Sequence, residues 1–202
     1  TTGQVATTVK DLQGNTLFLN NGELVDQDRG IDLWLSTYPT FATPFTGTIN
    51  IYWGIGGSGG QSCSSTGALT APALEVLILT GSTTAPVLTK YVYDDCATRR
   101  TGPNANNFTD PTGTGGSVNG ISGTTFLYNT TPITITNGLI AKIIPIYNST
   151  KIAVVGTGGT LPAQGKVIES VETAGDTRRK IIYYESYPQI PNEIFPYAIL
   201  SQ

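Results

Sequence analysis

The chain has 202 residues, a formal net charge of −3, 39% hydrophobic residues, only 12% charged residues and no His. Without His, no Ser-His-Asp or Cys-His nucleophile and no His-ligated zinc site can form. Two Cys are too few for a four-cysteine metal site. The small negative charge argues against a nucleic-acid partner, whose phosphates require clustered Lys and Arg. We therefore expect neither a cofactor nor nucleic-acid binding.

The pattern of apolar residues is that of short strands separated by Gly-, Pro- and Asn-rich turns. No run of ten or more residues has a clean helical period, and no apolar run is long enough to span a membrane. We predict an all-β, antiparallel, sandwich-like fold with a C-terminal hairpin and no long helix, and a single domain over residues 1–202. The expected strands, in chain order, are Thr16–Leu19, Glu23–Asp26, Ile31–Leu35, Gly47–Trp53, Leu74–Thr80, Val87–Tyr93, Ser117–Ile121, Thr124–Tyr128, Leu139–Tyr147, Lys151–Gly156, Lys166–Thr173 and Thr177–Tyr184.

Two of these strands carry further expectations. Pro145 cannot donate a backbone hydrogen bond, so its strand is expected at a sheet edge or at a bulge. The last two strands form the clearest hairpin, around a Gly175-Asp176 turn that suits type II′ geometry. Its charges lie near the turn and its apolar residues near the open end, which predicts a base buried on both faces and a tip in water. The register places complementary residues opposite each other: Glu172 with Arg179, Ile168 with Tyr183, and Lys166 with Glu185.

The segment Gln4–Lys10 is extended by propensity but has no local hairpin partner. Its backbone donors and acceptors therefore need a sheet edge elsewhere. Three placements remain open: pairing within its own domain, addition to the sheet of a neighbouring subunit, or a connector to a removed membrane helix. Residues 1–12 are thus a possible connector or exchanged strand.

Four groups of residues are candidates for chemistry or binding. A chain without Met and a low-charge, Thr- and Gly-rich composition indicate an exported, extracellular protein. In such a protein, an even pair of Cys flanking a predicted hairpin predicts a disulfide. Loop carboxylate pairs are weak candidates for calcium ligands, although solvated turn positions are the favoured interpretation. Trp rings are weak candidates for a sugar platform, although packing in the core is the favoured interpretation. Three glycosylation sequons occur, as many as chance produces in so Ser- and Thr-rich a chain. The residues are Cys63 and Cys96 (disulfide); Asp26, Asp28, Asp94 and Asp95 (metal); Trp34 and Trp53 (platform); and Asn107, Asn129 and Asn148 (sequons).

The end of the chain resembles a known family. The segments Leu161–Ser170 and Thr173–Lys180 resemble the terminal strand–turn–strand of minor-pilin-like proteins of the type IV pilus system. Ser186–Ser201 is similar to the tails of such proteins in small-genome bacteria, and Trp53, the two Cys and Tyr91–Arg100 fit the same pattern. The resemblance implies a pilin-like headgroup, cut from a longer precursor whose N-terminal hydrophobic helix anchors it, with other copies or other pilin and surface subunits as partners.

Three functions from different classes follow. The first is a non-enzymatic extracellular structural or adhesive protein, a pilin-like headgroup or surface-fibre subunit. The second is a carbohydrate- or ligand-binding module of an exported protein. The third is a glycan hydrolase that uses paired carboxylates, although Glu169 and Glu172, three apart on one predicted strand, point to opposite faces. We favour the structural function.

Overall fold

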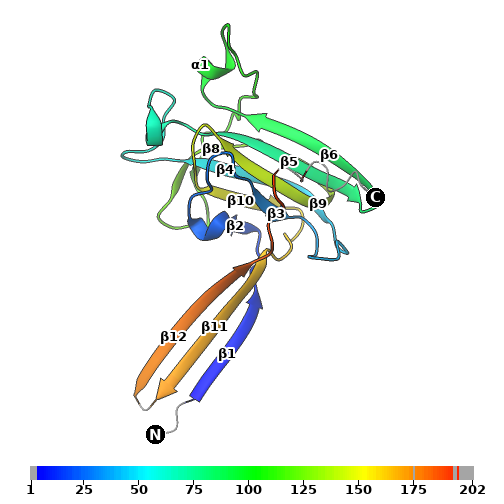
Figure 1. Cartoon of the computed structure of the whole chain (residues 1–202), viewed down its shortest axis with the longest axis vertical. Helices are drawn as coiled ribbons and strands as arrows, with labels where there is room; N and C mark the ends of the chain where they lie inside the picture. The colour runs from blue at the N-terminus through cyan, green and yellow to red at the C-terminus, as the bar shows by residue number, and fades with distance from the viewer. Residues whose placement is uncertain (1–3, 175, 193–194, 196–202) are drawn as a thin grey trace.

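The computed structural model describes residues 4–174, 176–192 and 195, and it has two parts (Figure 1). The body contains nine strands of one continuous network. The arm is a separate three-stranded sheet of β1 (Gln4–Asp11), β11 (Gly165–Ala174) and β12 (Thr177–Ser186), and it projects from one end of the body. All the strand ladders are antiparallel, and the one α-helix in these residues, α1 (Ala97–Arg100), has four residues. The predicted all-β antiparallel fold without a long helix is confirmed.

The body strands pair in the order β2-β10-β4-β9-β5-β6, with β3 paired to β9, β8 to β4, and β7 to β8. Their bounds are β2 (Thr16–Phe18), β3 (Ile31–Trp34), β4 (Phe45–Ile55), β5 (Ala73–Ser82), β6 (Ala85–Tyr93), β7 (Gly116–Ser117), β8 (Thr125–Asn129), β9 (Ile133–Ile146) and β10 (Ile152–Thr157). The predicted hairpin between Leu74–Thr80 and Val87–Tyr93 is present as β5 and β6.

Strand β9 is long enough to serve both layers of the body. Its first part, Ile133–Gly138, pairs with β4, and the part from Ile140 onward pairs with β3 on one edge and β5 on the other. Asn137, at φ 52°, lies near the end of the first part, and the register shifts on either side of Gly138, against β4 before it and against β5 after it. The side chains of both layers meet in one core that includes Ile51 and Trp53 from β4. The body is therefore sandwich-like.

Two expected strands differ from the structure. The segment Glu23–Asp26 is not a strand, because only Val25 forms a bridge, to Thr150. The predicted strand Ser117–Ile121 is reduced to β7, and the chain between β7 and β8 is a longer loop than the expected two-residue turn. Short polar segments of this kind carry too little apolar periodicity to distinguish a strand from an extended loop.

Pro145 does not lie on an edge strand or at a bulge. It pairs with Leu74 in the middle of the β-network, in a stretch of unbroken register. Its other side is beyond the end of β3, which stops at Ile31 opposite Ile143, and there its carbonyl accepts a hydrogen bond from Asp28 N–H. A proline is tolerated at this position because no neighbouring strand requires the donor that it lacks.

Gln164 joins the arm to the body. Its side-chain oxygen accepts a hydrogen bond from Trp34 N–H at 2.8 Å, and its amide donates to the carbonyls of Trp34 and Pro162. Its backbone continues the arm, since Gln164 N–H donates to Leu12 and the Gln164 carbonyl accepts from Tyr187 N–H. One buried side chain therefore holds the base of all three arm strands against β3.

An ion pair between Asp32 of β3 and Lys142 of β9 lies inside the body. Lys142 Nζ is 2.7 Å from Asp32 Oδ1, and both side chains are at most 1% exposed. Lys142 also donates to the Ile190 carbonyl, while Asp32 Oδ2 accepts from Ile190 N–H. Burial raises the pKa of Asp32, and the hydrogen bonds from Lys142 and Ile190 oppose this shift. The pair ties the segment that follows the arm back onto the body.

Candidate functional site

Neither Trp is available to a ligand. Trp53 has no exposed surface, and its indole N–H donates to the Pro72 carbonyl at 3.1 Å. Trp34 is 5% exposed and packs among Tyr38, Phe41 and Tyr187. The prediction of a sugar platform at Trp53 and Trp34 is therefore wrong. Both rings occupy core positions, which sequence alternation alone does not separate from exposed ones.

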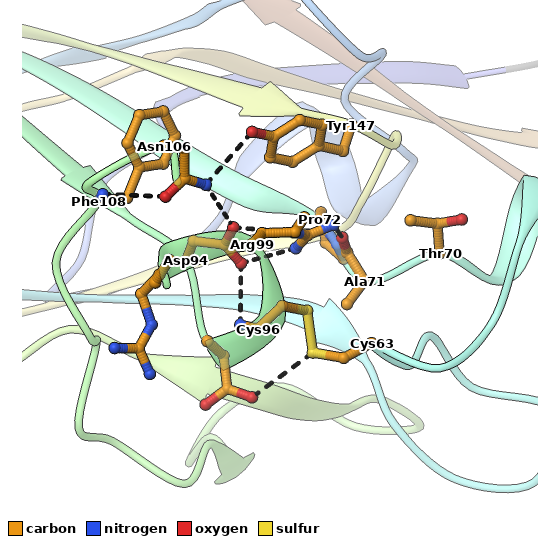
Figure 2. A network of polar contacts seen from close by, with 12 residues as sticks. Cys63, Thr70, Ala71, Pro72, Asp94, Cys96, Arg99, Asn106, Phe108 and Tyr147 are labelled. Carbon is orange, nitrogen blue, oxygen red and sulfur yellow. Dashed lines mark hydrogen bonds and ion pairs between the residues drawn. A yellow bond between two sulfur atoms is a disulfide. The ribbon is translucent and has the colours of Figure 1, made fainter. Parts of the chain in front are cut away.

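Asp94 organises a polar cluster at the end of β6 (Figure 2). Arg99 donates to both of its oxygens, at 2.8 and 2.6 Å, and Asn106 and the backbone N–H of Cys96 donate at 2.8 and 2.9 Å. The Arg99 guanidinium also lies 4.4 Å from the centre of the Tyr147 ring. Asp94 has no exposed surface, and charge-assisted bonds of this kind hold a loop firmly. The role of Asp94 is structural, so the expectation that it binds calcium is wrong.

The predicted disulfide is present. Cys63 and Cys96 are bonded, with their Cα atoms 5.4 Å apart, and the bond links the loop before β5 to the start of α1. Asp95 Oδ2 lies 4.0 Å from Cys63 Sγ, but a disulfide sulfur has no hydrogen to donate. Burial, followed by the charge of Asp110, raises the pKa of Asp95.

The remaining carboxylates predicted to bind metal do not form a cluster. Asp26 lies 3.7 Å from Arg29 in an exposed ion pair, and Asp28, at φ 59°, accepts a hydrogen bond from the Gln27 amide. Within the described part of the chain, no three His, Cys, Asp or Glu residues lie close enough to hold a metal ion together. Asp26, Asp28 and Asp95 are therefore not part of a carboxylate cluster of the kind that calcium favours.

All three sequon amides already donate hydrogen bonds, that of Asn107 to the Ala105 carbonyl at 3.5 Å. The side chain of Asn148 donates to the carbonyls of Ala68 and Thr70, and that of Asn129 donates to Thr130 and accepts from Gly115 N–H. Asn107 is the exposed member of the three, at φ 58°. A glycan on Asn129 or Asn148 would break these hydrogen bonds.

Two buried tyrosines make the stability of the folded protein depend on pH in the alkaline range. Burial raises the pKa of Tyr93 and of Tyr128 to about 12, from the ordinary 10.0, with added effects of Tyr91 on the first and Asp95 on the second. Because the folded state favours the protonated phenol, this contribution to stability is complete below pH 10 and is lost as the pH rises toward 12. In an absorbance titration of phenolate, Tyr93→Phe and Tyr128→Phe should each remove a step near pH 12. Titration of all the phenols together near pH 10 would contradict this placement.

A cleft of about 320 Å³ lies where the arm meets the body, lined in part by Phe18, Asp32, Gln164 and Tyr184. Both polar side chains among these four are committed to structure, Asp32 to Lys142 and Gln164 to Trp34. The lining also includes the polar residues Gln13, Thr16, Asn20, Asn21, Ser186 and Gln189, so the cleft has polar as well as apolar walls.

The arm differs from the body in that neither of its faces is covered. All eight residues of β1 and all ten of β12 are exposed. Val5, Val9, Ile181 and Tyr183 are each about 60% exposed or more. The prediction that the base of the C-terminal hairpin is buried on both faces is therefore wrong. The residues are apolar enough for burial, but among the residues that the structure describes no second layer packs on them.

Strand register divides the arm residues between two faces. The predicted register of the hairpin is confirmed, because Glu172 pairs with Arg179, Ile168 with Tyr183, and Lys166 with Glu185. The segment Gln4–Lys10 pairs with β11 of the same chain. Residues directly opposite each other share a face. The apolar residues of the Tyr183 face are Val5, Val9, Ile168, Ala174, Ile181 and Tyr183, and those of the Tyr184 face are Ala6, Val167, Val171, Ile182 and Tyr184.

Ion pairs lie at the base of the arm and near its middle. Lys166 forms an ion pair with Asp11 at the base, and Lys180 pairs with Glu169 at 2.8 Å. The hydrogen bond to Asp11 raises the pKa of Lys166, and the hydrogen bond from Lys180 lowers that of Glu169. Exposed pairs of this kind contribute little to stability. The arm is therefore held mainly by its backbone ladders and leaves apolar side chains available to a partner.

The outer edges of β1 and β12 are also open, because among the described residues each of these strands pairs with β11 only. In the same residues, no helix is both long and apolar enough to cross a bilayer. Comparisons with models of protein families, with curated proteins and with solved structures found no match to this chain.

Proposed function

We propose that this chain is a non-enzymatic extracellular structural subunit, pilin-like or part of a surface fibre, and that it joins its assembly through the arm. The observation that carries the proposal is the exposure of apolar side chains on both faces of the arm, Tyr183 at 60% and Tyr184 at 47% among them. Contiguous exposed apolar surface on a folded protein marks an interaction site. Open strand edges are the usual template for adding a strand from another chain.

The buried carboxylates support a role without catalysis. Asp32 and Asp94 are the buried acidic side chains of the described part, and each is committed to an ion pair, with Lys142 and Arg99. Without His, the chain also lacks the commonest general base. The disulfide between Cys63 and Cys96 supports an oxidising, extracellular location.

The direction of β1 fits the resemblance to minor pilins. Its first residue, Gln4, lies opposite Thr173, close to the turn at the far end of the arm. A segment preceding β1 would therefore leave from the tip of the arm. In a pilin-like precursor, this geometry would hold the arm near the membrane or the filament axis and direct the body outward.

Photo-crosslinking in the cell that makes the protein tests this proposal. A photoreactive amino acid replaces Tyr183 on the arm, and the control replaces Val87 on β6, which is 58% exposed on the body. We expect surface-exposed protein, with crosslinks to subunits of a sedimenting assembly from position 183 and few from position 87. Intracellular protein, or crosslinks from position 87 alone, would overturn the proposal.

A further inference from the structure

The arm ends in the open edge of β12, which has the sequence Thr177-Arg-Arg-Lys-Ile-Ile-Tyr-Tyr-Glu-Ser186. All ten residues are exposed, and β11 is the one strand that pairs with β12 in the described part of the chain. We propose that this edge pairs with β12 of a second copy of the chain, antiparallel, about a two-fold axis at Ile182. The inference rests on the proposed function and names its partner and register.

Symmetry restricts the registers that two identical edges can adopt. A two-fold axis that relates antiparallel neighbouring strands is perpendicular to the sheet, so it keeps each face on the same side. Successive residues of a strand alternate between the faces. Opposite residues must therefore both be odd-numbered or both be even-numbered. It follows that one residue lies directly opposite its own counterpart, and the axis passes midway between these two copies.

Charge selects one register from this set. Glu185 is the one acidic residue of β12, and Arg179 is the one basic residue with the same parity. The midpoint between them is residue 182. An axis there brings Arg179 of each copy opposite Glu185 of the other, so the dimer gains two ion pairs. Among the described residues, neither side chain has an ion-pair partner within its own chain.

The same register joins the apolar residues of the two arms. Ile181 of each copy lies opposite Tyr183 of the other, and Ile182 lies opposite its own counterpart. On the Tyr183 face, Ile168 pairs with Tyr183 within the chain, so one apolar row crosses the junction. Lys180 lies opposite Tyr184, where a cation can contact an aromatic ring. Two three-stranded arms thereby become one six-stranded sheet with apolar patches on both faces.

The edge of β1 does not offer this complementarity. Its charged residues, Lys10 and Asp11, are adjacent, so they differ in parity and cannot lie opposite each other about any two-fold axis. An interface of one strand edge from each copy is also small beside the roughly 1,200–2,000 Å² of a standard interface. We therefore expect a reversible, concentration-dependent dimer.

Charge reversal in the full 202-residue chain tests the register. Arg179→Glu places four acidic groups at the junction, and Glu185→Arg places four basic ones. Each variant alone should dimerise about 10- to 100-fold more weakly in sedimentation equilibrium. Mixed in equal amounts, they should form a heterodimer of wild-type strength, because each Glu then faces an Arg. Failure of the mixture to associate would overturn the register.

A cysteine at the axis tests the same geometry covalently. Opposite residues of antiparallel strands have Cα atoms about 4.5–5.5 Å apart, within disulfide range. Ile182→Cys should therefore give a disulfide-linked dimer under mild oxidation. Tyr184→Cys, on the same face but about 14 Å from its counterpart along the strands, is the matched control and should remain unlinked.

Equal linkage of both cysteine variants, a monomeric wild-type chain, or open-ended oligomers would overturn β12 pairing. The crosslinking experiment at Tyr183 reads out separately whether the arm contacts another subunit in the surface assembly. A monomeric wild-type chain that still crosslinks there would refute the pairing and leave the proposed function standing.

Discussion

Replacing Lys142 with Met should destabilise the protein by about 3–5 kcal/mol, because removal of one partner leaves a buried carboxylate without its counter-charge. The Asp32 side chain has no exposed surface and would retain only the Ile190 N–H as a donor. The expected result is a lower midpoint of denaturant unfolding with an unchanged slope. In the body, the loss should appear as weaker attachment of β3 and of the segment near Ile190.

The pH dependence of the stability loss distinguishes an uncompensated charge on Asp32 from a loss of packing around residue 142. Burial already raises the pKa of Asp32, and removing Lys142 removes an interaction that lowers it. A carboxyl with a raised pKa in the folded state loses stability as the pH rises above its unfolded value of about 3.8. The deficit of Lys142→Met should therefore be largest at neutral pH and should shrink toward pH 4. The double variant Asp32→Asn with Lys142→Met should recover most of the loss at pH 7, and a pH-independent deficit would contradict the account.

Removing the disulfide should cost about 3–4 kcal/mol in the chain-entropy description. The bond closes a loop with a sequence separation of 33, which includes the whole β5–β6 hairpin. The matched change is Cys63→Ser together with Cys96→Ser, so that no free thiol is left. We expect a lower thermal midpoint in the variant, and the same midpoint in the reduced wild-type chain.

The arm provides a control for this prediction. Strands β11 and β12 lie outside the loop that the disulfide closes. In the variant without the disulfide, hydrogen exchange in the arm should therefore change less than exchange near Asp94 and α1. An equal loss of protection in both places would indicate global unfolding and contradict the assignment of the bond to the loops at the end of β6.

Local patterns were sufficient for the elements that depend on neighbours in sequence. The β5–β6 hairpin, the disulfide, and the register of Lys166 with Glu185 follow from alternation, turn residues and cross-strand charge. These features are set by a few residues on either side of a turn.

Features set by distant contacts could not be predicted in this way. The partner of Gln4–Lys10 is β11, more than 150 residues later, and no local signal indicates it. Burial of the hairpin base was predicted wrongly, because Ile181 and Tyr183 are exposed. An alternating strand shows that one face prefers burial, but the layer that covers it lies elsewhere in the chain or in another molecule.

The ion pair of Asp32 with Lys142 shows the same limit. Each residue looks like an ordinary charge on a strand, and the two are 110 positions apart. Their pairing results from the register of β3 on β9, which places Asp32 directly opposite Lys142. The ion pair of Arg99 with Asp94 is easier to predict from sequence, because the two residues are five positions apart and a short loop brings them together.

Hydrogen exchange measured by mass spectrometry, on the free chain and on the chain within its isolated surface assembly, tests most directly whether the arm is the assembly interface. The open edge of β12 should exchange quickly in the free chain and become protected in the assembly. The edge strand β6 of the body should change little, which makes it an internal control. Protection confined to peptides from residues 4–11 and 165–186 is the result we predict. Unchanged exchange in those peptides, with new protection on β6 or elsewhere on the body, would contradict the account.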